Sequence, residues 1–202
     1  MGMTYDVGND FELAPEGPHV GRCIKIIDLG TQHNIHWDKW QKKVMFTFEL
    51  TNTAMEDGRP FIITNVYTAS MHSKSNLRKD LESWRGKSFS DEAASSFDIL
   101  NCLNVPAFLN IVHNTTGDNT YANIKAIMPL PRETVCPEPK NEIFFINLAE
   151  FNDDTFKKLS EKMQEKIMKC KEWENINRNI KTAAAGINKF EDVNSEPSDI
   201  PF

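Results

Sequence analysis

The sequence contains no apolar run approaching about 18 residues, so it predicts no membrane-spanning helix. Its N-terminus lacks a basic stretch followed by an apolar one, so we expect no secretion signal. Cysteine is scarce and scattered, with no Cys-x-x-Cys pair among Cys23, Cys102, Cys136 and Cys170. This spacing favours reduced thiols in a cytosolic protein over a disulfide framework or a zinc site.

Sequence motifs for catalysis are also missing. Neither a G-x-x-x-x-G-K-[ST] loop nor a G-x-G-x-x-G loop is present, so we expect no bound nucleotide cofactor. His33 and His36 lie three residues apart without further ligands nearby, which favours loop surface over a metal site. Carboxylates in predicted turns, such as Glu56 and Asp91, could serve a metal-dependent nuclease, which is the one enzyme hypothesis considered. They form no matching constellation, and we expect no enzymatic activity.

The charge is unevenly distributed. The 29 acids and 23 bases give a net charge of −6, which argues against a nucleic-acid partner at first sight. Residues 191–202 hold four acids and no base, so the rest of the chain carries only −2 (−6 + 4). Local basic clusters then matter more than the sum. One cluster, Lys39, Lys42 and Lys43, lies beside two tryptophans; the other comprises Lys74, Arg78, Lys79, Arg85 and Lys87.

Alternating and β-branched segments predict five strands separated by turns. Residues 44–50 alternate most clearly, with Phe46 and Phe48 on the predicted core face. The polar, basic and aromatic residues 30–43 predict a loop. A hairpin is expected between the last two strands, through residues 115–119. The predicted strands are residues 19–29, 44–50, 61–71, 107–113 and 121–128.

A helix is predicted between the third and fourth strands. Leu77, Leu81 and Trp84 recur at helical spacing, Ser73 or Ser75 can cap the start, and Gly86 can end it. Three strands, a helix and two strands form the element order of an oligonucleotide-binding (OB) fold. We therefore predict a mainly β, α+β protein with a five-stranded OB-fold barrel, a helical insertion and a C-terminal helix. The expected parts are a lead-in (1–18), the barrel (19–130), a Pro-rich connector (131–150), an amphipathic helix (151–185) and a disordered acidic tail (186–202).

Two tryptophans in a polar, lysine-rich segment favour stacking on the bases of a single strand. Trp37 and Trp40 would stack, while Lys39, Lys42 and Lys43 would contact phosphates; the alternative is that the indoles close the barrel end. On the fifth strand, Tyr121 and Lys125 are expected to face outward. Lys74, Arg78 and Arg85 form a helical stripe that either contacts phosphate or is solvated, and Tyr67 either faces the ligand or the core.

The apolar stripe of residues 151–185 has two alternative roles. It includes Phe156, Leu159, Met163, Ile167 and Cys170, at spacings of three and four. We expect it to dock on its own barrel. The alternative is a homodimer through a coiled coil.

The segment Asp199, Ile200, Pro201 and Phe202 follows an acidic run that is poor in apolar residues. It resembles the C-terminal tip of bacterial single-stranded DNA-binding proteins, which recruits replication, recombination and repair enzymes in that family. The resemblance implies a partner with a small apolar pocket and a basic rim.

A second resemblance lies upstream. Residues 76–86 (NLRKDLESWRG), together with residues 27–31 (IDLGT) and 121–124 (YANI), resemble a family of bacteriophage single-stranded DNA-binding proteins with an OB fold. The two resemblances imply a protein that coats single strands and recruits host or phage enzymes, in the cytoplasm of the infected bacterial host. The alternative is an OB-like adaptor that acts mainly by binding protein.

Overall fold

The computed structural model describes residues 12–35 and 37–180. The chain divides into two compact units. The first combines the residues up to Ile27 with Val44–Phe145, and the second combines Asp28–Lys43 with the residues from Ile146 onward. The long strands β1 (Gly17–Asn34) and β2 (Lys39–Ala54) contribute residues to both.

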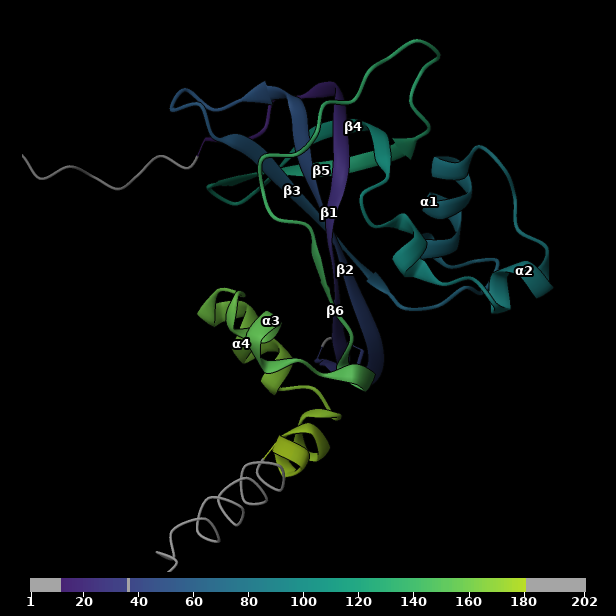
Figure 1. The fold of residues 1–202 in the computed structure, drawn as a ribbon, viewed down its shortest axis with the longest axis vertical. Coiled ribbons are helices and arrows are strands. Elements are labelled where there is room, and N and C mark those ends of the chain that lie inside the picture. The colour runs from purple at the N-terminus through teal and green to yellow at the C-terminus, as the bar shows by residue number, and fades with distance from the viewer. Residues whose placement is uncertain (1–11, 36, 181–202) are drawn as a thin grey trace, which may run out of the picture. The chain divides into compact units, whose positions relative to one another are not determined.

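One antiparallel sheet organises the first unit (Figure 1). Its strands lie in the order β3-β2-β1-β4-β5, and the short strand β6 pairs with β1. The prediction of a mainly β protein with helices is confirmed, but the sheet is not closed by a β3–β5 pairing in the described residues. The remaining strands are β3 (Pro60–Thr68), β4 (Pro106–Thr116), β5 (Asn119–Met128) and β6 (Phe144–Ile146).

The predicted loop over residues 30–43 is wrong. β1 continues to Asn34 and β2 begins at Lys39, so the segment is a β-hairpin arm with a short turn between the strands. Within the second unit this arm packs against the C-terminal helices. Such tertiary contacts outweigh the polar composition that favoured a loop.

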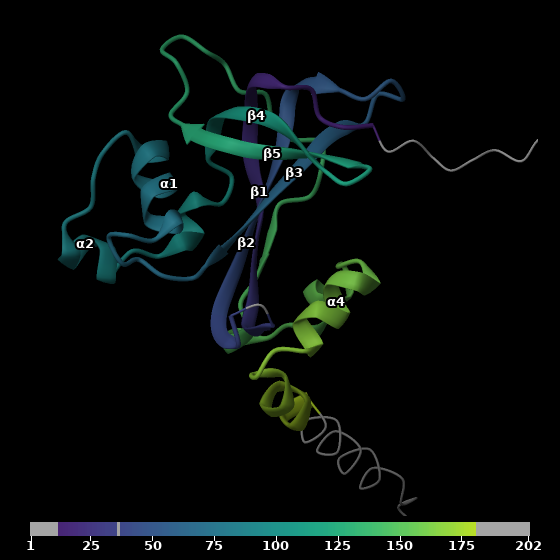
Figure 2. The same ribbon diagram turned by 180° about the vertical axis from the view of Figure 1, so that it is seen from behind.

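The inserted helix forms where the sequence predicts it. α1 (Asn76–Arg85) begins after Ser75, whose side chain accepts a hydrogen bond from the Arg78 amide at 3.2 Å. It ends at Gly86, whose φ of 64° favours glycine because it has no Cβ. α1 packs against β3 and β5, as Figures 1 and 2 show. The shorter helices α2 (Asp91–Ser95) and η1 (Ile99–Cys102) follow.

The core of the first unit lies between the sheet and α1. Phe46 and Phe48 are fully buried, as the alternation of β2 predicts. Phe48 packs edge-on against Trp84 of α1, with ring centroids 5.3 Å apart. The opposite face of β2 is also buried, including Thr47 and Glu49. A second layer therefore covers this side of the sheet.

That second layer is formed by residues 131–143 of the predicted Pro-rich connector, and we call this segment the strap. The Glu49 carboxylate accepts hydrogen bonds from the backbone amides of Lys140 and Asn141 at 2.7 and 2.9 Å. The buried guanidinium of Arg22 donates to the Cys136 carbonyl at 3.1 Å and forms an ion pair with Glu138 at 3.2 Å. Two buried charged side chains thus hold the strap on β1 and β2.

Replacing Glu49 with Ala should free the strap and lower the free energy of unfolding by about 1–3 kcal/mol, because the backbone amides of Lys140 and Asn141 lose their acceptor. Glu49→Gln is the matched control, since its amide oxygen can still accept one of these hydrogen bonds. Hydrogen exchange at Lys140 and Asn141 should accelerate strongly in the alanine variant and less in the glutamine variant. Unchanged exchange in both variants would show that Glu49 does not hold the strap.

The C-terminal part of the second unit contains several helices instead of the single long helix that was predicted. They are η2 (Leu148–Glu150), α3 (Asp153–Lys157), α4 (Glu161–Met168) and a further helical stretch over residues 173–180. Ser160 occupies the N-cap position of α4 and marks one break. The breaks let Phe151, Phe156 and Trp173 form an aromatic cluster with centroid distances of 5.2–5.6 Å.

The apolar stripe predicted for this region is largely buried. Phe156, Leu159, Ile167 and Cys170 are buried, and Met163 is partly buried. An ideal Cβ on Gly30 would lie 2.5 Å from the Cys170 sulfur, so only glycine fits there without a shift. The stripe therefore contacts the hairpin arm of its own unit.

Candidate nucleic-acid interface

The tip of the hairpin arm exposes large apolar side chains. Trp37 is 67% exposed, Trp40 is 47% exposed, and the neighbouring Ile35 is 87% exposed. Apolar side chains that gather on an exposed surface often mark a binding site. The idea that these tryptophans close a barrel end finds no support in this exposure, while base stacking remains compatible with it. His36 lies outside the described residues.

The two tryptophans differ in their surroundings. The Trp40 ring lies 4.9 Å from the His33 ring, between centroids, and the Lys171 ammonium lies 4.3 Å from its centroid. These contacts occupy part of the Trp40 surface, and the one with Lys171 ties it to the C-terminal segment of its own unit. Trp37, at the tip, is the more accessible indole and the stronger candidate for stacking.

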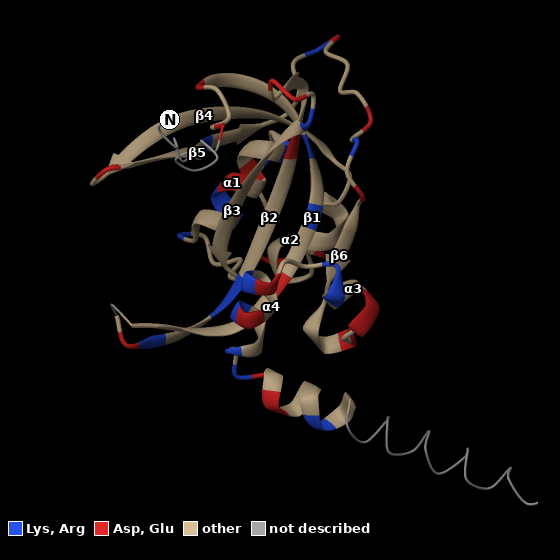
Figure 3. Cartoon of the chain, turned by 90° about the vertical axis from the view of Figure 1, so that its left-hand side faces the viewer, with Lys and Arg blue, Asp and Glu red and all other residues tan. Residues whose placement is uncertain are grey.

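The lysines of the arm surround these rings, and Figure 3 marks basic positions along it. Lys39 and Lys42 are exposed, and Lys43 is partly buried beside the Gln41 side chain at 2.9 Å. Lys42 pairs with Asp28 at 3.2 Å. The Lys42 side chain is exposed and solvent screens this pair, so a phosphate can compete for the Lys42 ammonium.

The base of the arm is fixed by a carboxylate from the helical segment. Glu172 accepts hydrogen bonds from the Thr31 amide at 2.7 Å and from the Thr31 hydroxyl at 2.6 Å. Partial burial works against ionisation of Glu172, but the hydrogen bonds from Thr31 outweigh it and lower the pKa of the carboxyl. The arm therefore projects from a defined base within its unit.

The fifth strand presents its predicted outer face. Tyr121 is 52% exposed and Lys125 is exposed, while Ala122 and Ile124 pack toward the core. Tyr121 and Lys125 belong to the first unit, whereas the arm residues belong to the second. They are therefore a separate set of candidate contacts.

Tyr67 faces the core. Its ring packs edge-on against Phe46 with centroids 5.7 Å apart, and its hydroxyl donates to Asp80 at 2.8 Å. Burial, together with the neighbouring Asp80 carboxylate, raises the pKa of this phenol. The ring is not placed to stack on a base.

The three predicted phosphate contacts at and just before the inserted helix also differ in burial. The Arg78 side chain is buried and pairs with Glu82 at 3.0 Å and Asp91 at 2.9 Å, which fixes α1 to α2. Lys74 and Arg85 are exposed, and the Arg85 guanidinium lies 3.9 Å from the Phe89 ring centroid. Lys74 and Arg85 remain candidates for phosphate contact, while Arg78 already has internal partners.

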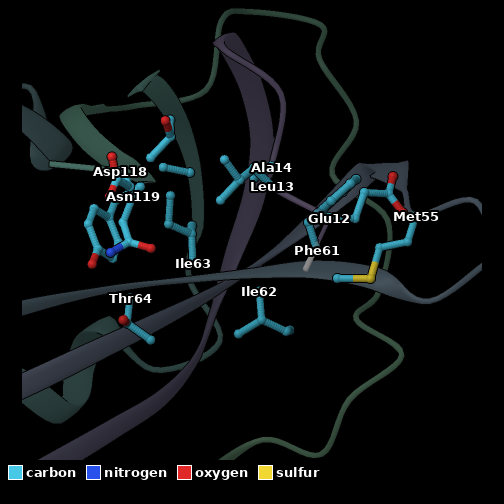
Figure 4. A pocket seen from close by; sticks show the side chains of 13 residues that line it. Glu12, Leu13, Ala14, Met55, Phe61, Ile62, Ile63, Thr64, Asp118 and Asn119 are labelled. Atoms are coloured by element: carbon cyan, nitrogen blue, oxygen red, sulfur yellow. The ribbon is translucent and has the colours of Figure 1, made fainter. Parts of the chain in front are cut away.

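A groove of about 720 Å³ lies between β3 and β5 (Figure 4). Sequence reasoning missed it, because it forms where two strands distant in sequence approach without pairing. Ile62 on β3 is 40% exposed beside it. The lining residues are Glu12, Leu13, Ala14, Met55, residues 61–64, Asp118, Asn119, Thr120, Tyr121 and Ala122.

Within the described residues, no cluster of three or more His, Cys, Asp or Glu side chains could hold a metal ion, and no helix is long and apolar enough to cross a membrane. Burial raises the pKa of the free thiol of Cys102 to about 12 and that of Cys170 to about 11, which favours structural roles. The segment Asp199, Ile200, Pro201 and Phe202 lies outside the described residues.

The chain matches no protein-family model, and no curated protein matches its sequence.

Proposed function

We propose that this chain is a single-stranded DNA-binding protein that coats exposed strands with little sequence preference during phage replication or recombination, in the cytoplasm of a bacterial host. The observation that carries the proposal is the hairpin arm, where exposed Trp37 and Trp40 lie among Lys39, Lys42 and Lys43. Aromatic rings among basic side chains bind single strands without reading the sequence. The rings stack on nucleobases, and the basic side chains contact phosphates.

The strand order supports an OB-like arrangement in this proposal. An OB fold is a five-stranded, partly open barrel whose β1–β2 and β4–β5 loops bind oligonucleotides. The tip of the arm occupies the first of these loops, and the turn at Gly117–Asp118 occupies the second. β3 and β5 approach within 8 Å between Cα atoms, and α1 contacts both, as expected where such a barrel closes.

An adaptor that binds mainly protein is the second candidate. The observation that favours it is the groove between β3 and β5, whose lining contains Glu12 and Asp118 but no Lys or Arg. Such a surface suits a polypeptide better than a phosphate backbone.

A gel shift with oligo(dT) separates these two functions. The proposed function predicts a retarded complex, whereas the adaptor predicts unshifted DNA at the same protein concentrations. Added Mg²⁺ tests the remaining enzyme hypothesis, because a nuclease would shorten the strand and a coating protein leaves it intact.

Truncation after Ser198 tests the proposed division between strand binding and partner recruitment. We expect the truncated chain to lose capture of host enzymes that recognise Asp-Ile-Pro-Phe tips, because the Phe202 ring and the Asp199 charge are removed together. Its affinity for oligo(dT) should stay equal or rise slightly, since a competing acidic segment is shorter. A variant that keeps its partners but loses oligo(dT) binding would reverse this division.

A further inference from the structure

A second set of exposed lysines lies beside the arm, on residues 166–171, which we call the lysine segment. The segment begins in the last turn of α4 and continues past the end of that helix. The side chains of Ile167 and Cys170 are buried and hold the segment in its unit. The other face of the segment presents ammonium groups to solvent, because three of its lysines are exposed: Lys166, Lys169 and Lys171.

Hydrogen bonds fix the lysine segment against the base of the arm. The Gln32 side chain donates to the Lys166 carbonyl at 2.9 Å, although the two residues lie 134 positions apart in the sequence. The Lys171 amide donates to the Thr31 carbonyl at 3.1 Å. The lysines of the arm and those of the segment are therefore neighbours within one unit, which sequence reasoning could not show.

Lys171 connects the lysine segment to a candidate stacking ring. Its ammonium lies 4.3 Å from the centroid of the Trp40 ring. A cation–π contact at an exposed site is weak, so a phosphate can draw the ammonium away from the ring. Lys171 is therefore placed to contact the phosphate of a nucleotide whose base stacks on the accessible part of Trp40.

The charges around the lysine segment favour a polyanion. Among the residues that the structure describes, none of its three ammonium groups forms an ion pair. The carboxylate of Glu172 accepts hydrogen bonds from Thr31 and is engaged there. Glu165 and Glu174 are the exposed acids that flank the segment in sequence. Three bases beside two acids, next to the basic arm, give this face an excess of positive charge.

A purely structural role for these lysines makes a different prediction. Lys166 and Lys169 lie at the C-terminal end of α4, where a cation is stabilised by the helix dipole. Lys171 lies beyond the helix, so this effect does not account for it. A dipole role would affect stability, whereas phosphate contact affects the salt dependence of binding.

We propose that the lysine segment is a second phosphate-binding track, so that a bound single strand runs from the arm across Trp40 onto Lys171, Lys169 and Lys166. This inference rests on the proposed function, and it adds the C-terminal part of the second unit to a strand-binding surface otherwise formed by the arm. A basic track that continues past the stacking rings is the arrangement by which proteins follow a single-stranded backbone.

The salt dependence of oligo(dT) binding tests this track. For the triple variant Lys166→Ala, Lys169→Ala, Lys171→Ala, the slope of log affinity against log salt should be shallower by about 2, because each phosphate contact on a single strand contributes about −0.7. Arginine at the same three positions retains the charges and should keep the slope. Lys157→Ala removes a charge from α3, where Lys157 pairs with Asp153, and should also leave the slope unchanged.

A single substitution keeps the test independent of any damage to α4. Lys171→Ala lies outside the helix and should make the slope shallower by about 0.7. If the unchanged protein binds oligo(dT) and both alanine variants keep its slope, the second track is overturned while the proposed function stands. A lower melting temperature with an unchanged slope leads to the same conclusion, since the lysines then serve only α4. If the unchanged protein does not bind oligo(dT), the proposed function and the second track are both overturned.

Discussion

Replacing Trp37 with Ala is expected to weaken oligo(dT) binding roughly 5- to 150-fold, or about 1–3 kcal/mol, the usual contribution of one base–aromatic stack. The reason is the exposure of this indole, 67%, at the tip of an arm that carries three lysines. Trp37→Phe is the matched control and should retain part of the affinity, because a smaller ring still stacks. Quenching of the remaining tryptophan fluorescence on titration with oligo(dT) measures the effect.

Trp40→Ala should behave differently. Its ring is partly covered by His33 and Lys171, so we expect a smaller loss of affinity than for Trp37 and a lower melting temperature. If both alanine variants bind oligo(dT) as the unchanged protein does and remain folded, the arm is not the stacking surface. The strand would then have to contact the first unit, where Tyr121 and Lys125 are the exposed candidates.

Replacing Phe48 with Ala should lower the free energy of unfolding by about 3–5 kcal/mol, the range for deleting a buried phenyl ring. Phe48 is fully buried and packs against Trp84, so its removal leaves a cavity between the sheet and α1. Phe145 is 42% exposed, and Phe145→Ala is the control with a much smaller expected loss. Urea denaturation of both variants measures the difference.

The outcome for Phe48 tests whether α1 is part of the sheet's core. A loss below about 1 kcal/mol would contradict this arrangement. A phenyl ring packed between the sheet and α1 leaves a cavity that its neighbours fill only partly, and that cavity lowers stability. Binding of oligo(dT) by the folded fraction should be unchanged, because Phe48 lies in the first unit and is not on the arm.

Local signals predicted much of the fold. The alternation of β2 identified Phe46 and Phe48 as core residues, and the caps Ser75 and Gly86 defined α1. These features depend on neighbours within a few residues, so the sequence contains them. The register of the β4–β5 hairpin, which pairs Thr116 with Asn119, follows from the same kind of local turn chemistry.

The features that sequence reasoning missed depend on contacts between distant residues. The arm is a strand pair and not a loop. Its base is held by a hydrogen bond from the Thr31 amide to Glu172, and these residues lie 141 positions apart in the sequence. Arg78 was predicted either to contact phosphate or to be solvated, because it belongs to a basic stripe along the helix. The structure buries it among Glu82 and Asp91, and the second of these partners belongs to another helix.

The groove and the strap could not be predicted either, because both depend on contacts between residues far apart in the sequence. Neither Glu49, which holds the strap from the middle of β2, nor the gap between β3 and β5 has a local signature. For the candidate site, composition predicted the arm residues Trp37, Trp40 and Lys39, which the structure exposes. Composition could not separate Tyr121, which is exposed, from Tyr67, which is buried.

The salt dependence of oligo(dT) binding is the most direct test of the central claim. Lysines that displace counterions give a slope of log affinity against log salt of about −0.7 for each phosphate contacted on a single strand. If the arm binds single strands, the unchanged protein should show a clear negative slope. The triple variant Lys39→Ala, Lys42→Ala, Lys43→Ala should then show a slope shallower by about 2. An affinity that is the same at low and high salt, or a triple variant with an unchanged slope, would show that these lysines do not contact the strand's phosphates.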